Sequence, residues 1–170
     1  ADLEAAGGFS GTLTLAYNAD GGHKEWVDAT CASITTTLDI KCEGKPYPEF
    51  GPFRTAVNAD EMTGMFRTGW QADYPSIENF LVPLYQTGAS ANDGRWSNSQ
   101  FDDLMNQAAA SATTEEANAL YNQGQEILAA EMPVIPMWYY AQQSGWSENV
   151  DNVKFDWRGV LDLGAITVKS

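Results

Sequence analysis

The chain has 170 residues, of which 44% are hydrophobic and 19% are charged, and this composition is typical of one folded domain rather than a disordered segment. Its 9 basic and 23 acidic residues give a net charge of -14, which repels phosphate backbones and anionic lipid head groups. Nucleic acid is therefore not an expected partner. The longest apolar run, from Pro133 to Ala141, is much shorter than the roughly 18 residues that cross a bilayer.

The first residues indicate a piece of a longer protein. Residues 2–6, followed by Gly7 and Gly8, resemble the last turn and C-cap of a helix whose beginning is missing. The chain starts at Ala1 without a basic-then-apolar leader, so we expect that any export signal has been removed or lies outside this sequence. Neither a repeat nor an interdomain linker is visible, and we expect a single domain over residues 1–170.

The first half of the chain predicts alternating strands and helices. Residues 12–17 alternate Thr with apolar residues as in a strand, and the Asn, Asp and Gly residues of 18–22 predict a turn. From Lys24 to Leu38 the apolar residues recur at helical spacing and predict one buried stripe, made of Val27, Cys31, Ile34 and Leu38. Residues 40–42 then predict a short strand, 44–48 a turn and 50–57 a short helix.

The two cysteines, Cys31 and Cys42, both lie on predicted inward faces, on either side of one helix-to-strand turn. The returning strand can bring Cys42 beside the helix that carries Cys31, so we favour a disulfide, which suits an exported protein. Two buried free thiols are the alternative. Zinc is not expected, because two Cys and one His without CxxC spacing do not supply four ligands.

The second half is predicted to be mainly helical. Residues 64–66 indicate the end of a strand, and an apolar stripe from Ile77 to Tyr85 predicts a helix that ends by Gly88. Two capping-box patterns, at 97–100 and 113–116, each precede an apolar helical series and predict two further helices. The bulky, proline-bracketed residues 132–140 predict an edge or irregular strand that lines a ligand or fills the core, and 164–169 predict a closing strand.

The stretch from Arg67 to Ser76 is the candidate ligand site, because it falls at a strand-to-helix crossing, where open α/β sheets bind ligands. Pro75 restricts the backbone of Tyr74 and thereby orients the Asp73 carboxylate. Trp70 and Tyr74 supply flat surfaces that exclude water and strengthen an ion pair, which suits capture of a cation such as a peptide ammonium. The simpler interpretation is a core Trp beside an Asp that caps a turn.

These residues resemble the peptide-binding proteins of ABC importers, the oligopeptide- and dipeptide-binding group (solute-binding family 5). The matching segments are Gly69–Pro75 with Asn79–Leu81, Phe101–Leu104, Leu120–Tyr121 with Glu126–Leu128, and Pro133–Tyr140. The resemblance runs from about Gly11 to the end and implies one lobe of a type II periplasmic-binding fold, of mixed α/β class, with a mixed sheet flanked by helices. It covers only the C-terminal lobe of a two-lobed protein, so the N-terminal lobe is a missing partner.

The resemblance also assigns roles. It implies that Asp73 pairs with the α-ammonium of a peptide, beside Trp70 and Tyr74, and that Arg67 and His23 fall where some members meet the carboxylate of a short peptide. From the residues alone, a solvated Arg at a strand end and a surface His at a helix start are equally reasonable. Gln71 replaces a cysteine of some members, so the pair of Cys31 and Cys42 is a different one.

The expected function is therefore binding, without a cofactor, of oligopeptides or dipeptides for a membrane permease, by an exported and lipid-anchored protein. A second hypothesis keeps the fold but changes the solute to an oligosaccharide or a nickel chelate. A third is an extracellular hydrolase. It is disfavoured because neighbouring acids such as Asp102 and Asp103 diverge on a helix and because there is no Gly-x-Ser-x-Gly elbow.

Overall fold

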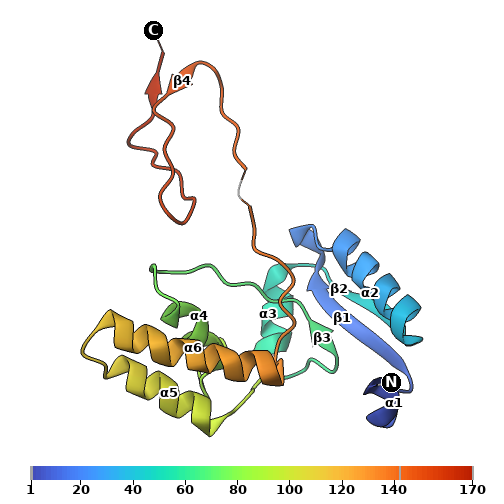
Figure 1. Cartoon of the computed structure of the whole chain (residues 1–170). Helices are drawn as coiled ribbons and strands as arrows, with labels where there is room; N and C mark the ends of the chain where they lie inside the picture. Colours follow the sequence, from blue (N-terminus) through green and yellow to red (C-terminus); the bar gives the residue numbers. More distant parts are fainter. Residues whose placement is uncertain (1, 142, 170) are drawn as a thin grey trace. The chain divides into compact units, whose positions relative to one another are not determined.

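The computed structural model describes residues 2–141 and 143–169 (Figure 1). The chain divides between Gly69 and Trp70 into two units. The first unit contains a three-stranded sheet with helices on both faces, and the second contains three helices and a small hairpin. The α/β class expected from the sequence is confirmed. No helix within 2–141 and 143–169 is long and apolar enough to cross a membrane.

The sheet of the first unit is parallel, with the strand order β2-β1-β3. Odd-numbered residues of β1 pack against α2, where Leu15 and Tyr17 meet Val27. The even-numbered Ala16 packs against Phe53 on the α3 side of the sheet, so the two helices cover opposite faces. In chain order the elements are α1 (Asp2–Ala5), β1 (Thr12–Asn18), the 3-10 helix η1 (Ala19–Gly21), α2 (Lys24–Leu38), β2 (Lys41–Tyr47), α3 (Phe50–Asn58) and β3 (Met65–Phe66).

Strand β2 is longer than the sequence predicts, and the turn expected over 44–48 is wrong. The chain stays extended through Gly44 and Pro46 to Tyr47. Gly44 lies under α2, where a Cβ would come within 2.9 Å of Val27 Cγ1, so this glycine allows close packing of helix on strand rather than a turn. Pro46 is tolerated because β2 is an edge strand.

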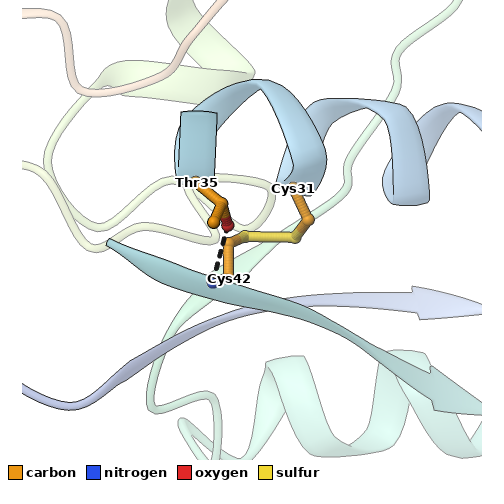
Figure 2. Close-up of a disulfide and its surroundings, with 3 residues drawn as sticks. All are labelled: Cys31, Thr35 and Cys42. Atoms are coloured by element: carbon orange, nitrogen blue, oxygen red, sulfur yellow. Dashed lines mark hydrogen bonds between the residues drawn. A yellow bond between two sulfur atoms is a disulfide. The ribbon is translucent and has the colours of Figure 1, made fainter. Parts of the chain in front are cut away.

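The disulfide prediction agrees with the structure, which joins Cys31 of α2 to Cys42 of β2 (Figure 2). Their Cα atoms are 4.8 Å apart, and Cys31 is buried. One helical turn further along α2, Thr35 Oγ1 accepts a hydrogen bond of 3.3 Å from the Cys42 backbone N–H. Helix α2 is thus tied to β2 by a covalent bond and by a hydrogen bond beside it.

The second unit packs three helices around a core of Leu81, Phe101, Leu104, Met105, Ala108 and Tyr121. Helices α5 and α6 run side by side in opposite directions (Figure 1). Gly124 faces this core, where a Cβ would lie 3.2 Å from the Phe101 ring and 2.6 Å from the movable end of Met105. The elements are α4 (Glu78–Tyr85), α5 (Ser99–Ala109), α6 (Thr114–Glu131) and an antiparallel pair of β4 (Val150–Asp151) and β5 (Thr167–Val168).

Of the two predicted helix caps, one is confirmed and the other is wrong by one residue. Thr113 caps α6 as predicted, since its hydroxyl accepts from the Glu116 backbone N–H at 3.2 Å. For α5 the predicted cap, Ser97, is one residue too early. The cap is Asn98, whose side-chain oxygen accepts from the Phe101 N–H at 3.0 Å.

The strand predicted over 132–140 is also wrong, since these residues pair with no strand among those described. Two prolines remove ladder donors, and the bulky side chains find little cover within the described chain. Tyr139 is 99% exposed and Ile135 is 66% exposed, so the alternative that these residues fill the core does not hold here either. The closing strand is limited to Thr167–Val168.

Candidate functional site

The first group of site residues lies where β1 and β3 end. The two strands are parallel neighbours, so their carboxyl ends meet at one edge of the sheet, where the strand order reverses. Asn18 ends β1, and Arg67 follows β3 directly, with its backbone N–H bonded to the Ala16 carbonyl at 2.9 Å. Arg67 Nη1 donates to Asn18 Oδ1 at 2.9 Å. We name the group of Asn18, Asp20, His23 and Arg67 the switch-point cluster.

Asp20 and Asn18 fix each other within this cluster. Asn18 Nδ2 donates to Asp20 Oδ1 at 2.6 Å, and the Phe50 backbone N–H, at the start of α3, donates to Asp20 Oδ2 at 3.2 Å. The hydrogen bond from Asn18, followed by the one from Phe50, lowers the pKa of Asp20. The carboxylate therefore stays ionised and holds the η1 turn against the first turn of α3.

His23 is buried beside this turn. Its Nδ1 accepts a hydrogen bond of 3.1 Å from Trp26 Nε1, which leaves the Nε2 atom as the protonated one in the neutral ring. Burial, and then the charge of Arg67, lower the pKa of His23, while Asp20 opposes the shift. The ring packs against Gly21, where a Cβ would lie 2.5 Å from Nε2, so this position requires glycine for close approach.

The second group is the loop from Trp70 to Ile77 together with Asn79 in the first turn of α4, all in the second unit. Asn79, only 3% exposed, accepts two hydrogen bonds at its Oδ1, from Trp70 Nε1 at 3.1 Å and from the Asp73 backbone N–H at 2.9 Å. The loop is also bonded to the C-terminal segment, because Gln71 Nε2 donates to the Arg158 carbonyl at 2.9 Å. One buried amide thus holds the backbone of Asp73 and the indole of Trp70 in fixed positions.

Three side chains of this loop, those of Trp70, Asp73 and Tyr74, are at least partly exposed to solvent. Asp73 is exposed, Trp70 is 38% exposed and Tyr74 is 43% exposed. The Tyr74 hydroxyl donates to the Glu78 carboxylate, and that bond raises the pKa of Tyr74. The loop therefore combines a carboxylate on an anchored backbone with two partly exposed aromatic side chains, a set of groups suited to holding a cation when a further surface covers it.

The structure therefore brings the predicted residues together in two sets. His23 and Arg67 belong to the switch-point cluster of the first unit, and Trp70, Asp73 and Tyr74 belong to the loop of the second. Sequence reasoning missed Asn18, Asp20 and Asn79. Asn18 and Asp20 stand in a stretch that predicts only a turn, and Asn79 was recognised only as part of a matching motif.

Other kinds of site find little support. Within the described ranges, no three His, Cys, Asp or Glu side chains lie close enough to hold a metal. A cavity of about 400 Å³ lies between residues 144 and 166, and its walls include Trp146, Phe155, Leu161 and Ile166. The lining contains no charged side chain and none of the predicted site residues.

Comparisons with known proteins identify relatives for most of the chain, although no family model matches it. The periplasmic murein peptide-binding protein MppA of Escherichia coli is 29% identical over 130 residues, which are 75% of this chain and 23% of that protein. The dipeptide-binding protein DppE of Bacillus subtilis is 28% identical over 153 residues, which are 89% of this chain and 27% of that protein. A probable deoxycholate-binding periplasmic protein of Escherichia coli, YgiS, is 37% identical over 73 residues, which are 43% of this chain and 14% of that protein.

Solved structures share the fold. The oligopeptide-binding protein OppA of Haemophilus influenzae, in complex with a peptide, superposes with a TM-score of 0.88 at 19% identity, over 99% of this chain and 34% of that chain. The resemblance to the oligopeptide- and dipeptide-binding proteins is confirmed: the chain is related to them and has the fold of part of them. It spans only about a quarter to a third of the length of the peptide-binding relatives it matches. These relatives are named as binding proteins, not as enzymes.

Proposed function

We propose that this chain is part of the solute-binding component of an ABC importer, which binds oligopeptides or dipeptides between two lobes and delivers them to a membrane permease. The observation that carries the proposal is the similarity to two peptide-binding proteins over 75% and 89% of the chain. Residues 1–170 form the C-terminal ligand-binding lobe, and a lobe that precedes them in the whole protein closes over the peptide.

Asp73 pairs with the α-ammonium of the bound peptide. Its backbone N–H is held by Asn79, and its side chain is exposed in the absence of a second lobe, as are the side chains of Trp70 and Tyr74 in the same loop. Closure removes water from this loop, so the ion pair strengthens, and an unpaired charge left in the closed site costs about 3–5 kcal/mol. A peptide without a free ammonium is thereby rejected, whatever its side chains are.

Arg67 meets the carboxylate at the other end of a short peptide, and His23 lines the same position. The guanidinium is half-buried and is oriented by Asn18, so it presents its charge at the carboxyl edge of the sheet. Binding through the two termini does not depend on the side chains of the ligand, which suits a carrier that accepts many sequences.

Calorimetry on the full-length protein tests this function. Alanine di-, tri- and tetrapeptides are compared with their N-acetylated forms, and we expect measurable binding of at least one free peptide with a loss of at least tenfold on acetylation. Equal affinities would remove the role of Asp73. The 170-residue chain alone serves as a second test: it lacks half of the enclosing surface, so we expect weak or no binding, and tight binding would contradict closure between lobes.

The peptide assignment has rivals, since a relative named for deoxycholate binding shares 37% identity over part of the chain. The exposed aromatic side chains of Trp138, Tyr139 and Tyr140 offer flat surfaces to a sterol or a sugar as well as to a peptide. A competition experiment decides between peptides, sterols and sugars. Displacement of a bound fluorescent peptide by short peptides, and not by deoxycholate or maltotriose, supports the peptide assignment.

We also propose that the whole protein is exported and held at the membrane by a lipid. Support for export comes from the Cys31–Cys42 disulfide, which is typical of oxidising compartments, and from the periplasmic location named for MppA. Fractionation of cells that produce the full-length protein tests both points. Recovery in the membrane fraction, with release by detergent and not by salt, is the expected result, and recovery in the cytoplasm would contradict it.

A further inference from the structure

Asn18 stands between the predicted carboxylate-binding group and a charged neighbour. It is 4% exposed, and both ends of its amide are used: Oδ1 accepts from Arg67 Nη1 at 2.9 Å, and Nδ2 donates to Asp20 Oδ1 at 2.6 Å. A guanidinium can only donate, and an ionised carboxylate can only accept, so the two neighbours together allow one orientation of this amide. Reversing it would break both hydrogen bonds.

The choice of a neutral amide next to Arg67 has an electrostatic consequence. A carboxylate at position 18 would neutralise the guanidinium in a half-buried site and reduce its attraction for a ligand carboxylate. Asn18 accepts a hydrogen bond from Arg67 Nη1 and, because an amide is uncharged, does not itself neutralise the guanidinium. The negative charge of Asp20 is bonded to the opposite end of the Asn18 amide, and the Phe50 N–H holds it there.

We propose that Asn18, itself oriented by Asp20, is a positioning residue that aims Arg67 at the terminal carboxylate of a short peptide and thereby sets the preference for free-acid ligands. This inference rests on the proposed function and on Arg67 as the carboxylate partner. It adds two residues that act through Arg67 rather than by touching the ligand. Gly21 also contributes to the position of Asn18, because a Cβ there would lie 2.7 Å from Asn18 Nδ2 and displace the amide.

The test uses the full-length protein and compares alanine di-, tri- and tetrapeptides with their C-terminal amides by calorimetry. The readout is the ratio of affinities for acid and amide, at the peptide length where that ratio is largest. For Asn18→Ala we expect the affinity for the acid to fall about tenfold, in the range of coupled neighbours, while the affinity for the amide changes less than about twofold. A loss of overall stability would lower both affinities, so the ratio isolates the aiming of Arg67.

A double-mutant cycle with Arg67→Ala provides the control. If Asn18 acts through Arg67, Asn18→Ala has no further effect on the ratio once Arg67 has been removed. Asn18→Asp keeps the size of the side chain and covers the case in which the alanine variant does not fold. We expect it to lower the ratio as well, because it neutralises Arg67 and repels Asp20.

The possible results distinguish a failure of the positioning role of Asn18 from a failure of the proposed peptide binding. A ratio that is unchanged in the Asn18 variants, or additive losses in the Arg67→Ala background, would overturn the positioning role while peptide binding stands. Equal affinities of the unaltered protein for acid and amide would remove the role of Arg67 and the inference with it, although peptide binding remains. Failure of the unaltered protein to bind any of the peptides would overturn both.

Discussion

Removal of the disulfide provides a quantitative test of the first unit. Cys31 and Cys42 are separated by 11 residues. A cross-link that closes a loop of this size lowers the entropy of the unfolded chain and thereby raises the free energy of unfolding by about 3 kcal/mol. For a chain of 170 residues, this corresponds to a decrease of about 6 to 12 °C in Tm. Alanine is the better replacement, because Cys31 is buried and a serine hydroxyl there would have no guaranteed partner.

The assay is urea and thermal unfolding of the oxidised chain, of the same chain with a reductant, and of Cys31→Ala/Cys42→Ala. We expect the reduced protein and the double variant to unfold at similar, lower midpoints. Thr35→Val is the matched control, since it removes only the acceptor of the Cys42 N–H bond and is expected to cost about 0.5 to 1.5 kcal/mol. Equal midpoints for oxidised and reduced protein, or two reactive thiols in the protein as isolated, would refute the reasoning.

Two further substitutions probe the site groups. Asn79→Ala leaves the indole N–H of Trp70 and the backbone N–H of Asp73 without their buried acceptor, so the free energy of unfolding is expected to fall by about 1–3 kcal/mol in urea titrations, and an unchanged value would contradict the anchoring role. His23 has a lowered pKa in the folded state, so the unfolded chain binds more protons below the ordinary value of 6.5 and stability falls as pH drops through that range. The slope of Tm between about pH 5 and 6.5 should flatten in His23→Gln, and an equal slope would show that this ring is not its source.

The spacing of apolar residues along the sequence predicts a helix well, but it does not show which strands depend on contacts made elsewhere in the fold. The helix Lys24–Leu38 was predicted with its observed bounds, because its apolar residues follow the helical period. Strand β2 was cut short in the prediction, because Gly44 and Pro46 indicate a turn when neighbours are unknown. Their tolerance in the strand depends on α2 packed above and on an open edge, and neither is visible in a sequence.

The residues of the candidate site divide in the same way: some are indicated by a local pattern, and others are brought together only by the fold. The sequence singles out the loop with Trp70, Asp73 and Tyr74 as a candidate, because its residues are adjacent and form a specific motif. Asn18 was not found, because its bond to Arg67 joins positions 49 residues apart, and no local spacing records a pairing of this kind. The roles assigned to Asp73 and Arg67 stay predictions until a ligand is bound.

The central claim is that the Asp73 carboxylate recognises the positive end of a peptide. The most direct measurement is a cycle on the full-length protein, in which Asp73→Asn and the unaltered protein each bind a free peptide and its N-acetylated form. The account predicts a loss of at least tenfold on acetylation for the unaltered protein and less than about twofold for Asp73→Asn, because the amide has no charge to pair. The same loss in both proteins would contradict it.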